Sequence, residues 1–435
     1  MPDDQPRVAG QDYPPSLSVV FVSNGPGELA TWVRPLAEEL HRSLQLRPRN
    51  QQSLISLRLV LVPCPNATGQ EAEAAGRWGQ FDRITPAGRF WPMLLNPHRE
   101  GPWAPQGVVV FLGGDQFWSV LLSARLGYRH ITYAEWVARW PRWNDRIAAM
   151  GPAVREQLPR RFRSRCTVVG DLMADLSSYA RSQAPLPEGE WVALLPGSKA
   201  AKLSVGMPFL LETADRLAQL RPGCRFLLPV APTTSVAVLE RFAGPGNPIA
   251  ASYNSGIARL EPVSAHCSWR RLITTAGTVI HLHEDPPAHG PLSQCALALT
   301  TVGANTAELG ALGVPMIVIV PTQHLAVMQA WDGWLGLLAR LPGLRWCIGA
   351  VLSAWRLRNH GFLAWPNISA GRVVVPERVG PIQPQGIAEE ALDWLRSPQR
   401  LEGQREDLRS LRGRPGAVAA LAHEVRGLLP KALAD

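Results

Sequence analysis

Three glycine-bearing turns hold the residues of this sequence that best suit chemistry on an anionic ligand. Each follows an apolar run and precedes a helical pattern, and they lie at residues 23–28 (SNGPGE), 194–199 (LLPGSK) and 300–310 (TTVGANTAELG). Glycine lets a ligand approach the backbone closely, and free N–H groups at a helix start favour negative charge. We therefore predict ligand contact at these turns, although each taken alone also fits an ordinary tight turn.

The first two turns contain glycines that leave the backbone accessible to a ligand, and the second adds a hydroxyl and a cation. Their candidate binding residues are Gly25, Gly27, Gly197, Ser198 and Lys199. Lys199 would act as a point charge on a phosphate, and the alternative is a β-turn with a solvated lysine. Glu28 closes the first turn and adds a carboxylate to the candidate site. The alternative is an ordinary tight turn in which the Glu28 carboxylate already has its hydrogen-bond partners.

The third turn suits a nucleotide. Gly303 permits a tight turn, Asn305 or Thr306 can cap the following helix, and backbone N–H groups there can hold a diphosphate. Glu308 lies one turn into that helix, where its carboxylate can accept hydrogen bonds from both hydroxyls of a ribose. The alternative is that Glu308 only complements the helix dipole.

Positioning these turns requires strands and helices in alternation, and the sequence supplies both. The expected strands are continuous apolar runs, which is typical of parallel strands covered on both faces: 18–22, 57–62, 108–112, 130–133, 167–169, 191–195, 225–230, 296–300 and 315–320. Helical patterns lie between them, as at 31–44, 207–220 and 306–312. The fold class predicted is therefore α/β with doubly wound sheets.

A change in composition divides the chain into two halves. Residues 180–190 (ARSQAPLPEGE) are rich in proline and small polar residues and suit a linker. We expect a loose tail at 1–15, a first Rossmann-like lobe at 16–180, a linker at 181–190, a second lobe at 191–380, and helices at 381–435 that pack back toward the first lobe.

Composition restricts the class of protein. The net charge is +9 and the pI about 9.7, so anions are the expected partners, but no run of five basic residues suggests a nucleic-acid arm. The six cysteines are widely spaced and suit reduced thiols in a cytosolic protein. No signal peptide and no run of 18 apolar residues are apparent, so any membrane contact is expected to be peripheral.

Four blocks, taken in order, resemble the lipid-A-disaccharide synthase family. They are CTVVGDLMAD (166–175), ALLPGSK (193–199), TVGANTAE with GVPM (301–316) and WPNISAGRVVVPE (365–377). The turn GPGE at 25–28 is similar to the family's GExSGD. The resemblance implies a GT-B fold with the nucleotide on the second lobe. It also implies an inverting, metal-independent and cofactor-free transfer from a UDP-acylglucosamine to a lipid monosaccharide phosphate.

The resemblance also assigns roles by position. It implies that Lys199 contacts the diphosphate, that residues 303–306 contact the phosphates, and that Glu308 contacts the ribose. Asn367 and Arg372 are implied to line the cleft. Homodimers occur in the family. We expect a cytoplasmic location, with any membrane contact at the inner face of the cytoplasmic membrane.

Several positions depart from the family pattern. The family's turn GIDAPDF has two aspartates, whereas here the turn reads GGDQFW (113–118), so that Asp115 matches the first and the second is absent. Lys199 replaces an arginine, which removes bidentate geometry, and Asp171 replaces a histidine. The segment 325–363 is longer and richer in tryptophan. These departures point to a divergent branch whose acceptor and donor acylation stay open.

An inverting transfer needs a base for the acceptor hydroxyl. The candidates are Asp115 and Glu28, both at strand ends of the first lobe. The alternative for Asp115 is that it only organises the turn at 113–114.

Tryptophan and arginine cluster in two segments of a chain that holds 16 tryptophans. Such residues suit a headgroup boundary, so the clusters predict docking on an anionic membrane, while core tryptophan with solvated arginine is the alternative. The clusters are Trp136, Arg139, Trp140, Arg142 and Trp143, and then Trp331, Trp334, Arg340, Arg345, Trp346, Trp355 and Arg356.

Two other functions fit the same fold. A UDP-GlcNAc 2-epimerase-like enzyme would need no lipid acceptor, but the block at 365–377 speaks against it. A descendant that binds a nucleotide sugar or lipid without turnover is kept open by the missing second aspartate. A nucleic-acid partner is not expected, because the charge is dispersed and no recognition motif is present.

Overall fold

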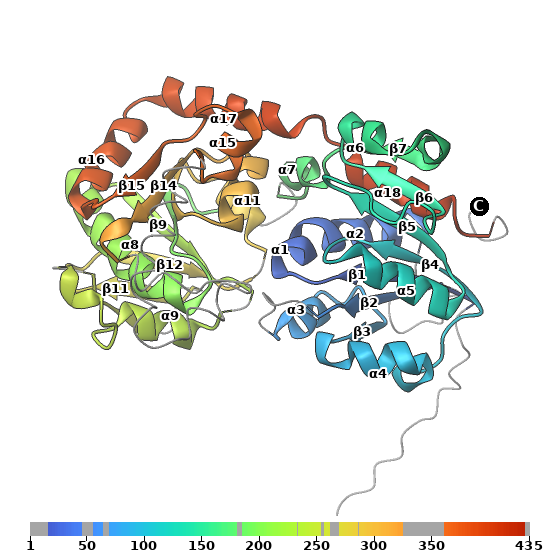
Figure 1. The fold of residues 1–435 in the computed structure, drawn as a ribbon. Helices are drawn as coiled ribbons and strands as arrows, with labels where there is room; N and C mark the ends of the chain where they lie inside the picture. The colour runs from blue at the N-terminus through green and yellow to red at the C-terminus, as the bar shows by residue number, and fades with distance from the viewer. Residues whose placement is uncertain are drawn as a thin grey trace, which may run out of the picture.

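The computed structural model describes residues 16–45, 55–63, 69–180, 185–232, 234–253, 256–261, 269–285, 287–324 and 361–430. Within these ranges the chain forms two β-sheets with helices on both faces, in two lobes that lie side by side (Figure 1). The expected tail, linker residues 181–184 and the second tryptophan cluster lie outside the described residues.

The first lobe is built on a seven-stranded parallel sheet, counted over the described residues. Its strands, in spatial order, are β3 (Arg83–Thr85), β2 (Ile55–Leu61), β1 (Leu17–Ser23), β4 (Gln106–Phe111), β5 (Arg129–Ala134), β6 (Arg146–Ala149) and β7 (Cys166–Val168). Its helices are α1 (Pro26–Glu28), α2 (Arg34–Ser43), α3 (Glu71–Arg77), α4 (Phe90–Leu95), α5 (Gln116–Leu126), α6 (Pro152–Gln157) and α7 (Leu176–Ala180), with a π-helical turn η1 (Leu29–Val33) between α1 and α2.

The second lobe has an eight-stranded sheet within the described ranges. Its order is β10 (Ala258–Glu261), β11 (Arg271–Thr274), β12 (Val279–His283), β9 (Cys224–Pro229), β8 (Glu190–Leu195), β13 (Leu297–Thr301), β14 (Met316–Pro321) and β15 (Glu377–Gly380). β10, β11 and β12 pair antiparallel at one edge, and the remaining pairs are parallel. Its helices are α8 (Ala200–Leu220), α9 (Val236–Ala243), α10 (His289–Ser293), α11 (Ala304–Leu312) and α15 (Trp365–Ala370).

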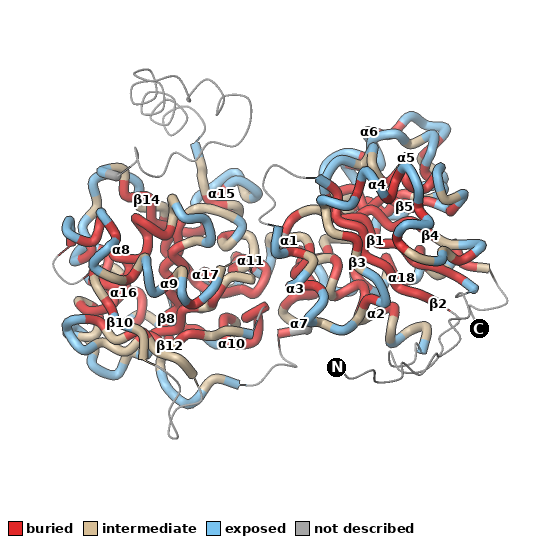
Figure 2. Tube along the Cα trace, turned by 90° about the horizontal axis from the view of Figure 1, so that it is seen from below, coloured by how far each residue is buried: buried red, intermediate tan, exposed pale blue. Residues whose placement is uncertain are grey.

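The central strands are mostly apolar because each face of a sheet packs against a different core. In β1, Val19 and Phe21 pack into one cluster with α2, whereas Val20 and Val22 pack into another with α4 and α5. In β8, Val192 and Leu194 likewise face α8 and Ala193 faces the opposite cluster. The sheets are accordingly buried inside both lobes (Figure 2).

The last three helices divide between the lobes. α16 (Pro384–Leu395) packs on α8 and α17 (Pro398–Arg412) on α11 and α15, so both stay with the second lobe. Only α18 (Ala417–Arg426) crosses over, where it packs against α2 and β6 (Figure 1). The expectation that the whole region from 381 returns to the first lobe is corrected accordingly.

The predicted fold class, α/β with two doubly wound lobes, is confirmed. The sequence reasoning missed β3, β6, β10, β11, β12 and β15, which are short or only alternately buried. Such strands lack the continuous apolar run that marks a fully covered strand. Among the described residues, no helix combines the length and apolarity needed to cross a bilayer.

Candidate functional site

A pocket lies between the lobes at the carboxyl ends of their central strands. Strand order reverses between β1 and β4 and between β8 and β13, and α/β sheets bind ligands at such reversals. Helices α1 and α11 face each other there in both views (Figures 1 and 2). The lining residues are Gly27, Ala30, Thr31, Leu195, Pro196, Gly197, Ser198, Pro229, Val230, Ala231, Pro232, Pro287, Ala288, Leu292, Ala304, Asn305 and Glu308.

Five of the residues predicted from sequence thus meet in one pocket: Gly27, Gly197, Ser198, Asn305 and Glu308. They come from three turns that are far apart in the chain. The other predicted residues do not line it, and their surroundings explain why.

In the turn after β1, the Glu28 side chain folds back over Gly25. A Cβ at Gly25 would overlap the Glu28 carboxylate, so glycine is required for this arrangement. The Glu28 side chain also covers the next turn, since its Cγ lies 3.1 Å from where a Cβ of Gly113 would stand. The two strand-end turns of the first lobe are therefore packed together around one partly buried carboxylate.

Asp115 is exposed and caps α5. Its carboxylate accepts a hydrogen bond of 2.9 Å from the backbone N–H of Phe117. The neighbouring Gln116 binds the loop after β5 from both sides: its amide donates to Val137 O at 2.8 Å and accepts from Arg139 N at 2.6 Å. The Asp115 turn and that loop therefore form one unit.

The two second-lobe turns are joined by a lysine that the sequence reasoning did not select. Lys202, in the first turn of α8, donates from Nζ to Val302 O at 2.7 Å. Lys199 stands at the N-cap of α8 and is exposed. The cation placed between the two turns is thus Lys202.

Glu308 lies in the pocket beside a buried histidine. Its Oε1 is 2.8 Å from Nε2 of His289, a close polar contact that is not aligned as a hydrogen bond. The Thr306 hydroxyl is buried and used within the turn, because it donates to Gly303 O at 2.9 Å and accepts from Trp365 N at 3.1 Å. Asn305 and Glu308 are therefore the polar third-turn side chains that line the pocket.

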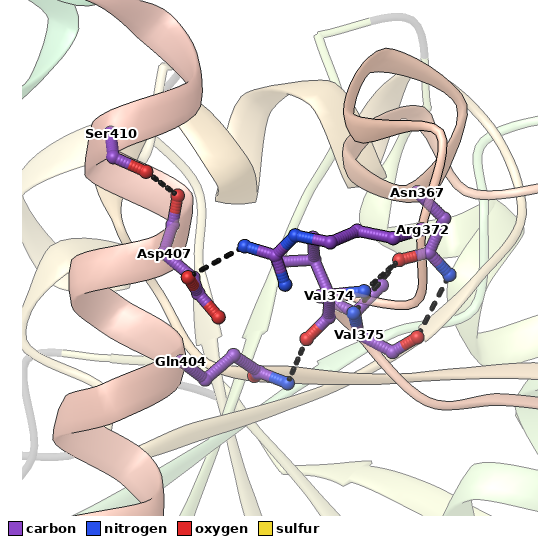
Figure 3. Close-up of polar contacts among 7 residues, drawn as sticks. All are labelled: Asn367, Arg372, Val374, Val375, Gln404, Asp407 and Ser410. Carbon is purple, nitrogen blue, oxygen red and sulfur yellow. Dashed lines mark hydrogen bonds and ion pairs between the residues drawn. The ribbon is translucent and has the colours of Figure 1, made fainter.

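The expectation that Asn367 and Arg372 line the cleft is corrected by their contacts (Figure 3). Asn367 is fully buried, and its amide accepts from Val374 N and Val375 N at 2.7 and 2.9 Å and donates to Val375 O at 2.8 Å. Arg372 pairs with Asp407 of α17 at 2.8 Å. Asn367 supports its own loop, Arg372 joins that loop to α17, and neither lines the pocket.

One further carboxylate was missed. Glu135 follows β5 directly, on the same sheet edge as Glu28 and Asp115, and is half-buried. Burial raises the pKa of Glu135, and the neighbouring carboxylates of Asp171 and Glu28 add to this, while Arg412 opposes it. A carboxylate with a raised pKa suits proton transfer. Its position straight after a buried strand is the signal that could have found it.

Buried charges connect the lobes behind this edge. Arg412, at the end of α17, pairs with Asp171 at 2.8 Å, donates to Ala307 O of α11 at 2.8 Å, and stacks on Trp365 with 3.2 Å to the ring centroid. Burial lowers the pKa of Arg412. Asp175 accepts from Gly416 N at 2.5 Å and Val418 N at 2.7 Å and so caps α18. Asp171 and Asp175 of the block at 166–175 thus hold the chain where it passes from α17 of the second lobe to α18 of the first.

The fold and the pocket define a two-lobed α/β protein with a pocket at the strand ends of both lobes. Comparison with known proteins adds that it is similar to lipid-A-disaccharide synthases. It is 28% identical over 242 residues to that of Anaeromyxobacter sp. strain K, covering 55% of this chain and 49% of the relative. It is 41% identical over 216 residues to that of Pseudomonas fluorescens Pf0-1, covering 48% and 43%.

The resemblance stated from the four sequence blocks is thereby confirmed. The chain spans about half the length of the curated relatives it matches. No known family profile matches it.

Solved structures with similar chains are distant. UDP-GlcNAc 2-epimerase from Neisseria meningitidis bound to UDP-GlcNAc has a TM-score of 0.47 at 11% identity, covering 94% of this chain and 98% of that one. MurG from Acinetobacter baumannii has a TM-score of 0.45 at 11% identity, covering 95% and 100%. Likenesses of this size carry no conclusion about function.

Proposed function

We propose that this protein is a glycosyltransferase that moves a glucosamine-type sugar from a UDP-sugar to a lipid acceptor, as lipid-A-disaccharide synthase does. The observation that carries the proposal is the shared pocket, in which Gly27 of the first lobe faces Gly197, Ser198 and Glu308 of the second. A transfer between two substrates needs such a site, because each lobe can present one of them. The sequence similarity to lipid-A-disaccharide synthases supports the same class.

The second lobe would hold the donor. Backbone N–H groups at Gly197–Ser198 and at the start of α11 suit the diphosphate. Glu308, one turn into α11 and lining the pocket, suits the ribose hydroxyls. The first lobe would then present the acceptor from the turns after β1 and β4.

The acceptor hydroxyl needs a base, and we assign this role to Asp115 with Glu28 as the second candidate. Both stand at the carboxyl ends of adjacent strands, β4 and β1. Asp115 is exposed, so its carboxylate is accessible to a substrate. Inversion follows when the activated hydroxyl attacks the anomeric carbon from the face opposite the leaving UDP.

The transfer is proposed to need no metal or other cofactor. Cations and oriented backbone dipoles of the protein can stabilise a leaving diphosphate. Activity measured after dialysis against EDTA should equal that of the untreated protein, and restoration by Mg²⁺ or Mn²⁺ of a lost activity would contradict this.

The decisive experiment measures UDP release by the purified protein over a panel of UDP-sugars, each with and without a lipid extract. Lipid-dependent release from UDP-GlcNAc or its acylated form supports the proposal. Conversion of UDP-GlcNAc to an epimer without lipid would instead indicate an epimerase. Binding of UDP with no turnover on any donor would indicate a protein that binds the nucleotide sugar without catalysis.

We further propose that the first lobe docks on an anionic membrane through an aromatic ridge. The ridge is defined as the exposed side chains of Trp91, Phe117, Trp136, Trp140 and Trp143. Trp118 connects two of them, with ring centroids 5.0 Å from Trp91 and 5.3 Å from Phe117. The exposed Arg139 and Arg142 lie in the same loop as three ridge residues, which suits contact with acidic headgroups.

Backbone geometry supports a function for this ridge. Trp140 adopts a left-handed conformation with φ of 56°, which is unfavourable for a bulky side chain. Its ring is nonetheless exposed and contacts Phe117 at 5.6 Å and Trp143 at 5.8 Å. The two hydrogen bonds of the Gln116 side chain join this loop to the Asp115 turn. A lipid held at the ridge would therefore lie beside the proposed base.

A further inference from the structure

We propose that His289 is a positioning residue that holds the Glu308 carboxylate in place for the ribose of a nucleotide. The proposal rests on the proposed function, in which Glu308 accepts hydrogen bonds from the ribose hydroxyls. His289 belongs to none of the sequence motifs, and the resemblance assigns it no role. The structure brings it to Glu308 from a different helix.

Burial separates the two side chains into one that a ligand can reach and one that it cannot. Glu308 lines the pocket and keeps 26% of its side-chain surface exposed. The His289 side chain keeps only 3% and does not line the pocket, although its chain neighbour Ala288 does. His289 can therefore act on a ligand only through the pocket wall, where it contacts Glu308.

The contact between the two side chains is short and polar. His289 Nε2 lies 2.8 Å from Glu308 Oε1, and this buried nitrogen has no aligned hydrogen bond. Hydrogen bonds at functional sites are often poorly aligned in the free protein and tighten when the substrate binds. A carboxylate has two oxygens and about four acceptor positions, so contact at Oε1 still leaves acceptors for two ribose hydroxyls.

The histidine is presented from a short helix that is itself fixed. His289 is the first residue of α10, which packs against α7 and α11. Within this helix Leu292 N donates to Ala288 O at 2.9 Å, and both of these residues line the pocket. Directly after the helix, the Gln294 side chain accepts from Leu186 N at 2.9 Å and ties α10 to the segment before β8. His289 is therefore held on a fixed element beside the pocket.

A carboxylate that is already held binds a ligand more tightly than a mobile one. Glutamate has three rotatable side-chain bonds, and ordering such a side chain on binding lowers the affinity. Contact with His289 restricts these rotations before a ligand arrives. Because Glu308 would accept from the ribose hydroxyls, the gain in affinity should be confined to ligands that carry them, and the uracil and diphosphate contacts should be unaffected.

The test measures binding of UDP and of 2′,3′-dideoxy-UDP, which lacks both ribose hydroxyls, to the full chain by titration calorimetry. His289→Leu keeps an apolar side chain at the buried position and removes the nitrogen donor. We expect the preference for UDP over the dideoxy ligand to fall about 3- to 10-fold, the range for one side chain ordered on binding. Binding of the dideoxy ligand itself should stay unchanged.

A double-variant cycle tests whether the effect passes through Glu308. In a Glu308→Gln background, His289→Leu should no longer change the preference, because residues that act through one contact are not additive. His281→Leu is the matched control, since this half-buried histidine of the same lobe packs against Trp191 and Trp269 and does not line the pocket. Its preference should equal that of the wild type.

A second pair of variants separates the hydrogen-bond donor from the packing of the ring. The amide nitrogen of His289→Gln reaches the position of the imidazole Nε2, whereas that of His289→Asn is one bond shorter. We expect the glutamine variant to retain most of the preference and the asparagine variant to lose it. Equal preferences in these two variants would contradict the proposal even if the leucine variant did not fold.

Three further outcomes would overturn the proposal. His289→Leu could retain the wild-type preference, or weaken both ligands equally, which would indicate a packing role, or keep its effect in the Glu308→Gln background. A wild type that binds UDP and the dideoxy ligand equally well would also overturn it and leave the glycosyltransferase function standing. Failure of the wild type to bind UDP at all would overturn the proposed function, and this proposal with it.

Discussion

Carboxylates stand at the ends of three neighbouring first-lobe strands: Glu28 after β1, Asp115 after β4 and Glu135 after β5. They differ in surroundings. Asp115 is exposed and caps a helix, whereas Glu28 and Glu135 are partly buried and repel each other. Their chemical roles can therefore be separated by single substitutions.

Asp115→Asn should remove a base without removing the helix cap, because asparagine caps as well as aspartate. We expect turnover to fall about 10²- to 10⁴-fold. The free energy of unfolding should change by less than about 0.5 kcal/mol, as for most surface substitutions. Steady-state kinetics and urea unfolding measure the two effects.

The matched control is Asp393→Asn, an exposed carboxylate on α16 in the other lobe, which should leave both quantities unchanged. Near-full turnover by the Asp115 variant would transfer the assignment to Glu28, to be checked with Glu28→Gln.

Glu135→Gln should stabilise the protein in a pH-dependent way. The pKa of Glu135 is raised in the folded state, so the folded state binds this proton more tightly than the unfolded chain does. Stability is therefore lost as the pH rises from the unfolded pKa through the folded one. Glutamine lacks that loss, so the melting temperature of the variant should match the wild type near pH 4 and exceed it at pH 7 to 8. A difference that stays constant over this range would contradict the explanation.

At the level of elements, the crossing of α18 to the first lobe depends on a cap supplied from a distant segment. Asp175 is buried and accepts from two N–H groups at the start of α18, 241 and 243 residues away. Leu421 and Val425 of α18 then complete the core against α2. The cap fixes where the helix begins, and the apolar face fixes where it lies.

Asp175→Ala leaves the N–H groups of Gly416 and Val418 without their acceptor, and that of Val418 is buried. A buried N–H group without a partner costs about 1–3 kcal/mol, so we expect a loss of that size in the free energy of unfolding. Urea denaturation measures this loss. Asp407→Ala removes an exposed ion pair with Arg372 and serves as the control, with less than about 1 kcal/mol expected. Equal effects of the two variants would mean that the cap contributes nothing beyond a surface contact.

At the level of the whole molecule, the pocket and the aromatic ridge use different surfaces of the first lobe. The pocket contains Gly27, Ala30 and Thr31 from the β1 side, and the ridge lies over α4, α5 and the loop after β5. Such a division suits an enzyme that takes one substrate from a membrane and the other from solution.

Trp140→Gly separates folding from docking. Glycine accepts the left-handed backbone, so relief of about 1–2 kcal/mol of strain should maintain or raise the melting temperature. Loss of one aromatic anchor worth roughly 1–2 kcal/mol should weaken binding to vesicles containing phosphatidylglycerol about 5- to 30-fold.

The measurement is vesicle co-sedimentation at low and high salt, with neutral phosphatidylcholine vesicles for comparison. Val373→Ser, an exposed apolar position of the second lobe, is the control and should bind as the wild type does. Binding that ignores anionic lipid, salt and the Trp140 substitution would reject the ridge as a docking surface.

The sequence by itself determined the strands buried on both faces and the turns that follow them. A strand such as 17–23 must be largely apolar when helices cover both faces, so the pattern is readable locally. The glycines after β1, β8 and β13 are readable for the same reason, because a tight turn at a strand end restricts its residues directly.

Tertiary structure alone decided which side chains meet. Lys202 rather than Lys199 lies between the two second-lobe turns, Asn367 supports its own loop, and Glu135 joins the strand-end carboxylates. The pair Arg412–Asp171 joins residues 241 positions apart. Such contacts depend on how two lobes and a returning helix pack, and no local pattern in the chain encodes that packing.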